Sequence, residues 1–450
     1  MAPRTKRKAV KTPKITCENY VPPPGHNAPA SYPWPHVGHE GQPIDLNDPM
    51  LLTFNYEGWN KESAQRYNTL LNTEIFPTRF SHTETLAALW LDTDVFETLS
   101  AMGIAPLCYQ TYELYPDLVR QALATAQISY ENPQAPTYET CSFSFMADSK
   151  FCSLSLDQLN EIYEISDERK DVAVENKFTP TERFWDLIAT GTGSFASRKA
   201  YQSQIRNPTL RVIAKMISNL LFAKDQTSKV TKGELQMLYS GLEDEIRRSR
   251  SGIPFQPMQT NSGYHLIWMF YSRRDCLLRN ENKKDRCGSL LTPLFKHFRI
   301  NLRAYAVNYN IEYVDTPYLI SCHILHDETT YRFMDKEGNM LYFKLPQTHL
   351  TNFSSIENIR FLPDPEFFCA DPRAPPPDDE MDEPEDITPD EDTVYDLGLL
   401  DDDADDATYR RWMVDLQRKN NRLMKRILKV ITGGCFGGQE ARPFAHEQTL

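Results

Sequence analysis

A predicted helical hairpin between residues 208 and 246 constrains the fold more than any other stretch of the chain. Asn207 is a good N-cap residue, and Pro208 suits the first helical position, where the N–H group that proline lacks would have no partner. Thr231 and Glu234 have the spacing of a capping box at the start of a second helix. Apolar residues then recur every three or four positions, which predicts two helices that pack together. They are Leu210, Ile213, Ala214, Ile217, Leu220 and Leu221 in the first helix, and Leu235, Leu238, Tyr239, Leu242 and Ile246 in the second.

The same segment carries a resemblance to a known family. The strings that carry it are Ser203–Arg211, Asn219–Phe222 and Lys232–Tyr239, preceded in the expected order by Thr73–Phe80 and Tyr112–Leu123. They resemble the protein encoded by the first open reading frame of Athila-type plant retrotransposons, a Ty3/gypsy class of transposable element. The resemblance runs from about Asn55 to Pro365 and leaves out the acidic tail. It implies a transposon origin in a plant genome and no particular biochemical activity.

Charge and composition divide the chain into five parts. Residues 371–406 hold seventeen Asp and Glu against Arg373 alone, a balance of −16, so the rest carries +3 of the formal net charge of −13. Segments this charged, or this rich in proline, cannot bury enough apolar surface to fold alone. We therefore expect a disordered basic and proline-rich arm (1–50), a globular region (51–366), an acidic disordered linker (367–407), an amphipathic or coiled-coil helix (408–432) and a tail (433–450).

For the globular region we expect an α+β fold that is predominantly α-helical, with a small antiparallel sheet. Alternating apolar residues in 141–146 and 151–156 predict a strand pair, and Ser155 is suited to cap the helix that follows. Three later runs separated by turn residues, 318–325, 331–335 and 340–345, predict the strands of the antiparallel sheet.

The short motifs of retroelement enzymes are absent from the sequence. It contains no Asp-Thr-Gly or Asp-Ser-Gly protease loop, no Tyr-x-Asp-Asp polymerase motif and no phosphate-binding loop. Cys322, His323 and His326 are close enough in sequence to suggest zinc ligands, but their apolar neighbours favour a packed strand. We therefore predict no catalytic residue, no metal site and no cofactor.

Cysteine usage and hydropathy indicate the compartment. Nine cysteines without a Cys-x-x-Cys pair are typical of reduced thiols in a cytosolic or nuclear protein. No apolar run approaches the ~18 to 20 residues that a membrane span requires. The basic cluster between Arg4 and Lys14 fits a nuclear localisation signal, so we predict a nuclear protein, with the cytoplasm as the alternative.

A basic strip between residues 196 and 232 is the best candidate for a binding surface. Its eight cations outnumber a lone Asp225 by +7, which favours binding to the phosphate backbone of RNA or DNA and competition by the acidic linker of the same chain. The alternative is a solvated helix face, because the exposed loop offers no aromatic residue on which bases could stack. The predicted nucleic-acid-binding residues are Arg198, Lys199, Arg206, Arg211, Lys215, Lys224, Lys229 and Lys232.

A heptad pattern near the C-terminus predicts self-association. Leucine at the d positions and a single asparagine at an a position favour a parallel homodimer, because each buried Asn can pair only with its mate. The alternative is an amphipathic helix that docks on the chain's own body. The predicted dimerisation residues are Met413, Leu416, Asn420, Leu423 and Ile427.

The predicted function is that of a non-enzymatic, retrotransposon-derived protein. It would bind nucleic acid or copies of itself in a gag-like or accessory role. The alternative is a degenerate transposase-like nuclease, because the carboxylates of such an enzyme are brought together by the fold and have no fixed spacing in sequence.

Overall fold

The computed structural model describes residues 38–48, 51, 59–166, 178–190, 195–197, 199–222, 229–249, 253, 261–279, 284–335 and 338–372. The chain divides into two compact units, 1–374 and 375–450, and every described residue belongs to the first. Most of the predicted N-terminal arm, nearly all of the acidic linker, the 408–432 helix and the tail lie outside the described residues.

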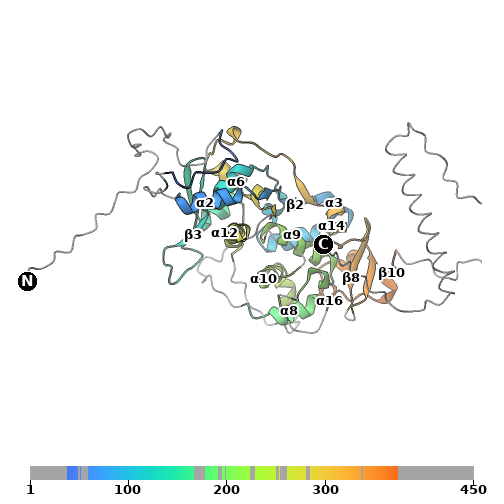
Figure 1. Cartoon of the computed structure of the whole chain (residues 1–450). Helices are drawn as coiled ribbons and strands as arrows, with labels where there is room; N and C mark the ends of the chain where they lie inside the picture. The colour runs from blue at the N-terminus through green and yellow to red at the C-terminus, as the bar shows by residue number, and fades with distance from the viewer. Residues whose placement is uncertain are drawn as a thin grey trace, which may run out of the picture. The chain divides into compact units, whose positions relative to one another are not determined.

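Helix α9 (Pro208–Leu220) is the central element, and all 13 of its residues are buried (Figure 1). It begins as predicted, because Oδ1 of Asn207 accepts a hydrogen bond from the main-chain N of Leu210. Helix α10 (Lys232–Gly241) begins with the predicted capping box, in which Thr231 and Glu234 bind each other's main-chain N–H groups. The two helices pack against each other, which confirms the hairpin. The second helix is shorter than predicted, because α10 ends at Gly241 and Ile246 belongs to a separate helix, α11 (Glu243–Arg248).

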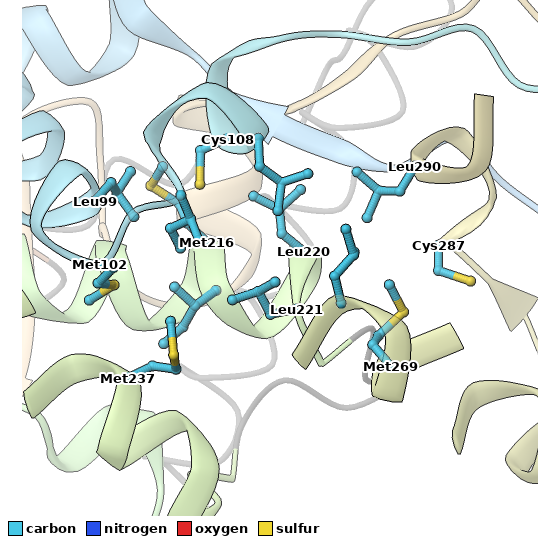
Figure 2. Close-up of a cluster of buried hydrophobic side chains, with 14 of the residues drawn as sticks. Leu99, Met102, Cys108, Met216, Leu220, Leu221, Met237, Met269, Cys287 and Leu290 are labelled. Carbon is cyan, nitrogen blue, oxygen red and sulfur yellow. The ribbon is translucent and has the colours of Figure 1, made fainter. Parts of the chain in front are cut away.

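Flexible apolar side chains from several elements enclose α9. Helix α4 (Asp92–Ala101) packs against α9 and α10, and helix α8 (Thr181–Ile188) packs against α10. Methionine fills irregular gaps between helices because its unbranched side chain has many conformations. Figure 2 shows the result, with Met216 and Leu220 of α9 among Leu99 of α4, Met237 of α10, Met269 of α12 (Ser262–Arg279) and Leu290 of the 3₁₀-helix η2 (Gly288–Leu291).

The first predicted strand pair is part of a three-stranded antiparallel sheet, β3-β4-β5. Strands β4 (Cys141–Ala147) and β5 (Lys150–Ser155) form the predicted pair, and β3 (Gln127–Tyr130) adds to it. Ser155 caps α7 (Leu156–Ile162) through a capping box with Gln158. The predicted order of strand, strand and capped helix is therefore confirmed.

The second antiparallel sheet has the order β10-β9-β8. Strands β8 (Thr330–Met334) and β9 (Met340–Lys344) are confirmed, with β10 (Phe368–Cys369) as the third strand. The strand predicted at 318–325 is wrong, because this segment begins inside helix α14 (Thr316–Ser321). Oδ1 of Asp315 caps that helix by accepting a hydrogen bond from N of Tyr318, and Pro317 occupies its first turn. These helix-start signals outweigh the alternation of apolar residues.

Two short parallel strand pairs, which the sequence did not predict, join distant parts of the chain. Strand β1 (Glu74–Ile75) pairs with β6 (Lys284–Asp285), and β2 (Arg79–Ser81) pairs with β7 (Glu312–Val314). These pairs fix residues 74–81 beside residues more than 200 positions away.

The remaining elements complete this unit. They are α2 (Lys61–Leu70), α3 (Thr83–Ala88), α5 (Ala105–Tyr109), α6 (Pro116–Thr125), α11 (Glu243–Arg248), α13 (Thr292–His297), α15 (Thr348–Thr351), α16 (Ile356–Arg360), η1 (Gln202–Gln204), η3 (Leu302–Ala304) and η4 (Pro365–Phe367). Within the described ranges, no helix has the length and apolar character needed to cross a bilayer. The seven cysteines in these ranges are free thiols.

Asp327 organises the turn that leads into β8. Its Oδ1 accepts hydrogen bonds from the main-chain N of Thr329 and Thr330 at 2.9 and 2.7 Å, and its Oδ2 accepts one from Oγ1 of Thr330 at 2.7 Å. Partial burial raises the pKa of Asp327, but these hydrogen bonds and the nearby Lys344 outweigh it and lower the pKa to about 2. The charged carboxylate is therefore the form that stabilises the turn.

We expect Asp327→Asn to lower the free energy of unfolding by about 1 kcal/mol at pH 7, a value reduced because the side chain is 43% exposed. The folded-state pKa lies below the unfolded-state value of about 3.9, so this stabilisation is present above about pH 4 and is lost as the pH falls towards 2. Urea unfolding at several pH values should show a flatter pH dependence in the variant. The exposed neighbour Glu328 provides a matched control as Glu328→Gln, and equal behaviour of the two variants would contradict the prediction.

Candidate nucleic-acid interface

Three of the eight predicted nucleic-acid-binding residues lie inside the protein. Arg206, Arg211 and Lys215 are 1%, 4% and 6% exposed. Two of them belong to α9, which other elements enclose, so one face of that helix is not a cationic surface. The helical period correctly placed Arg211 and Lys215 one turn apart, but it carried no information about what covers them.

Arg206 donates hydrogen bonds to main-chain carbonyls at the ends of two helices. Its Nε donates a hydrogen bond to the carbonyl of Arg360 at 2.7 Å, its Nη2 donates to the carbonyl of Leu187 at 2.6 Å, and its Nη1 donates to the carbonyl of Ala189. These carbonyls lie at the C-terminal ends of α8 and α16, where partial negative charge collects. Burial lowers the pKa of Arg206 to about 10, which leaves the guanidinium charged at neutral pH.

Arg211 and Lys215 have similar internal partners. Arg211 donates from Nη1 to the carbonyl of Arg332 at 2.6 Å and from Nη2 to the carbonyl of His323 at 3.0 Å. The Nζ atom of Lys215 lies 5.7 Å from the centroid of the Tyr318 ring, and burial lowers the pKa of this lysine. We therefore do not retain Arg206, Arg211 and Lys215 as phosphate ligands, because their charged groups already bind groups inside the protein.

Three other predicted residues, Lys199, Lys229 and Lys232, are exposed. The main-chain N of Val230 donates to the carbonyl of Ala200 at 2.9 Å, which joins the segment of Lys199 to that of the other two lysines. Arg198 and Lys224 lie outside the described residues.

An exposed aromatic ring that the sequence analysis missed lies among these lysines. Tyr201 forms an antiparallel bridge with Lys229, is 40% exposed, and has the Nζ atom of Lys229 at 6.0 Å from its ring centroid. Tyr201 precedes α9 in sequence and lies outside the segment that joins the two helices, but it pairs with Lys229 at the start of the second helix's segment. The sequence does place an aromatic residue between Lys199 and Arg206 of the basic strip, and this could have pointed to a stacking surface.

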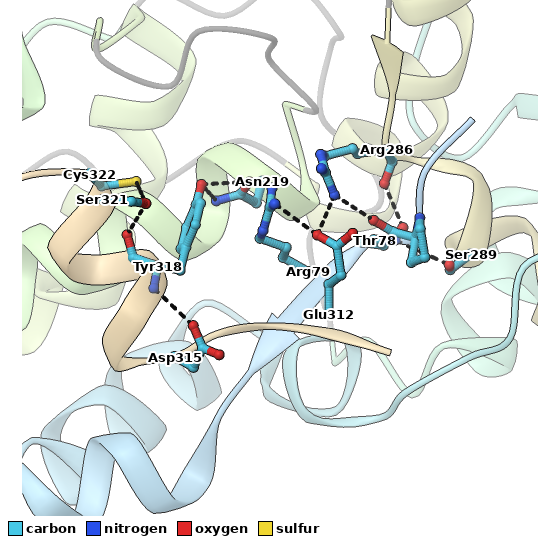
Figure 3. Close-up of polar contacts among 11 residues, drawn as sticks. Thr78, Arg79, Asn219, Arg286, Ser289, Glu312, Asp315, Tyr318, Ser321 and Cys322 are labelled. Atoms are coloured by element: carbon cyan, nitrogen blue, oxygen red, sulfur yellow. Dashed lines mark hydrogen bonds and ion pairs between the residues drawn. The ribbon is translucent and has the colours of Figure 1, made fainter. Parts of the chain in front are cut away.

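A second group of cations, also missed, surrounds the parallel strand pairs (Figure 3). Strand β2 presents Arg79, Arg286 follows β6, and β7 presents Glu312. Arg79 Nη2 lies 2.8 Å from Oε2 of Glu312, and Nη1 of Arg286 donates a hydrogen bond to the same oxygen. The guanidinium carbon of Arg79 lies 4.4 Å from the Tyr318 ring centroid, and that of Arg286 lies 4.9 Å from the Phe76 ring centroid.

Hydrogen bonds around Thr78 hold this second group in place. Oγ1 of Thr78 donates to the carbonyl of Arg286 at 2.6 Å, and the main-chain N of Thr78 donates to Oγ of Ser289 at 3.2 Å. Nη1 of Arg286 also donates to the carbonyl of Pro77 at 3.2 Å. Burial and the charge of Arg79 lower the pKa of Arg286, and Glu312 opposes this shift. More than 200 residues separate Arg79 from Arg286, so no local window of sequence shows both.

A cavity of ≈ 620 Å³ lies between α4 and α11, and its acidic lining makes it the place to look for the carboxylates of a nuclease. Its lining includes five acidic residues and one arginine: Asp94, Glu97, Glu243, Asp244, Glu245 and Arg248. The main-chain N of Phe353 donates to Oδ1 of Asp94 at 2.9 Å, and burial raises the pKa of Asp94. In the part of the chain that the structure describes, no three His, Cys, Asp or Glu side chains are grouped so that they could hold a metal ion. This holds both for the cavity and for the segment of Cys322, His323 and His326.

We expect Arg206→Gln to lower the free energy of unfolding by about 3 kcal/mol or more, because the substitution leaves buried carbonyl groups without donors. Lys229→Gln, at an exposed position, should change it by no more than about 0.5 kcal/mol. Urea unfolding followed by circular dichroism measures both values. If Arg206→Gln is as stable as the parent and loses only nucleic-acid binding, Arg206 belongs to the interface after all.

Comparison with known proteins supplies the family. The model of the ATHILA ORF-1 family matches residues 58–429, most of the chain. This match extends beyond Pro365 and covers the whole acidic linker and most of the 408–432 segment, so the expectation that the shared pattern leaves out the acidic tail is wrong. No curated protein and no solved structure matches the chain. The chain is therefore a retrotransposon-derived protein that belongs to the ATHILA ORF-1 family.

Proposed function

We propose that this protein binds the backbone of RNA or DNA without catalysing a reaction, in a gag-like or accessory role for its element. The observation that carries the proposal is the exposed ring of Tyr201 beside Lys229, with Lys199 and Lys232 exposed on the two chain segments that meet there. We call these four residues the Tyr201 surface.

Cations and an exposed ring act together on single strands. Lysines that neutralise phosphates release counterions, which gives affinity without sequence readout and makes it depend on salt. An aromatic ring adds a stacking surface that accepts any base. The Tyr201 surface combines both features, so unpaired RNA or DNA is the ligand that it fits best. We also propose Arg198 and Lys224 as phosphate-binding residues, on the strength of their place in the basic strip of the sequence alone.

We expect the replacement of Lys199, Lys229 and Lys232 by Ser to weaken binding of a labelled, unstructured oligonucleotide. Each lost phosphate contact should reduce the slope of log K against log salt by about 0.7, or about 2 in total. Fluorescence anisotropy across a salt series measures this slope. The matched control replaces three exposed lysines elsewhere with Ser: Lys61, Lys150 and Lys296.

A separate variant tests the ring. Tyr201→Ala should cost about 1 to 3 kcal/mol of binding free energy for a single strand while leaving the salt slope unchanged. Two results would contradict the proposal: the parent protein fails to bind any oligonucleotide, or the lysine variant and the control triple variant bind equally well.

Self-association is a further proposal, and it concerns residues outside the described ranges. Met413, Leu416, Asn420, Leu423 and Ile427 have the spacing of a parallel coiled-coil seam. In the full-length chain, Asn420→Lys would place a charge at the dimer seam, so sedimentation should show a dimer in the parent and a monomer in the variant. A parent that stays monomeric at every concentration would rule out the dimer. Nuclear import through the Arg4–Lys14 cluster likewise remains a proposal.

A further inference from the structure

We propose that Arg79 and Arg286 form a binding site for a phosphate group, distinct from the Tyr201 surface. The site consists of the two guanidinium groups, the carboxylate of Glu312 between them, and the rings of Phe76 and Tyr318 against which the guanidinium groups pack. We call it the two-arginine site. It takes its ligand from solvent, because the two arginine side chains are 19% and 27% exposed.

The charges at the two-arginine site are unbalanced. Both arginines bind one oxygen, Oε2 of Glu312, so a single carboxylate faces two guanidinium groups. Asp315, also drawn in Figure 3, accepts a hydrogen bond from the main-chain N of Tyr318 and caps the start of α14. Lys284, which also contacts the Phe76 ring, is paired with Glu74. The two arginines and Glu312 leave a net charge of about +1, which favours an anion such as a phosphate group.

Donors remain to bind such an anion. A guanidinium carries five N–H donors. Within the described ranges, the polar contact of Arg79 is the ion pair with Glu312, and the polar contacts of Arg286 are those with Glu312 and the carbonyl of Pro77. Both side chains therefore keep N–H groups for a forked, charge-assisted contact, which phosphate oxygens accept well.

The surrounding structure favours a phosphate over a base. The rings of Phe76 and Tyr318 each already have a guanidinium close to the ring, which leaves less ring surface for stacking than Tyr201 offers. Two parallel strand pairs and the hydrogen bonds of Thr78 fix the arginines before any ligand arrives. Because the two guanidinium groups are already held in place, they lose little conformational freedom when an anion binds.

The first experiment measures inorganic phosphate binding to the full-length chain by ³¹P NMR titration at constant ionic strength. Arg79→Gln and Arg286→Gln should each weaken binding about tenfold or more. Glu312→Gln removes the opposing charge and should tighten binding about tenfold. Arg303→Gln, at an exposed arginine outside the site, is the matched control and should bind as the parent does.

The opposite response of Glu312→Gln separates a binding site from a structural ion pair. If the three side chains only stabilise the fold, all three site variants lower the free energy of unfolding and none strengthens phosphate binding. That result, or a parent that does not bind phosphate, overturns the proposal. Where a glutamine variant fails to fold, Arg79→Lys and Arg286→Lys keep the charge but lose the forked donors, and they should still weaken phosphate binding. Equal competition by an oligoglutamate peptide would overturn the assignment to phosphate.

A second arm identifies the source of the phosphate. If the group belongs to nucleic acid, Arg286→Gln should remove the oligonucleotide binding that remains after Lys199, Lys229 and Lys232 are replaced. If it is a free phosphate compound, Arg286→Gln changes inorganic phosphate binding alone. Failure of the proposed function appears differently, because a parent chain that binds no oligonucleotide can still bind inorganic phosphate at the two-arginine site.

Discussion

The complete burial of α9 is the constraint on which the rest of this unit depends. Burying a charged side chain costs several kcal/mol unless it is paired and hydrogen-bonded. Arg211 lies on this helix and Arg206 just before it, and both donate to main-chain carbonyls, at the ends of α8 and α16, in β8 and in the turn after α14. The position of the central helix therefore fixes where the neighbouring elements must end.

The basic strip in the sequence thus separates into two roles. Cations near the ends of elements, such as Lys199, Lys229 and Lys232, stay in solvent, whereas those in and beside α9 hold the interior together. A count of charges along the chain cannot distinguish them, because position in sequence does not say which side of a helix other elements will cover. The cations assigned to binding are consequently fewer than the strip suggests, and they come with an aromatic ring that the strip alone did not reveal.

Local signals predicted local structure well. Side-chain caps at Asn207, Ser155 and Thr231 act through neighbouring main-chain atoms, so the sequence places them directly. The error at 318–325 arose because alternation was weighed without the cap at Asp315. The parallel strand pairs and the two-arginine site could not be predicted, since their partners are set by tertiary packing and leave no signal in a short window. Tyr201 could be predicted only in part. Its place in the basic strip is visible in the sequence, but its exposure to solvent is set by tertiary packing.

The parallel pairs also determine how much of the chain must exist before this unit can close. Strands β1 and β2 near residues 74–81 find their partners only at residues 284–314, so these contacts form late during synthesis and make folding slow. A retrotransposon copy with a stop codon before residue 284 would encode β1 and β2 without their partner strands. Their unpaired edges would then favour aggregation. Truncated copies should therefore be lost as insoluble chains rather than persist as smaller working proteins.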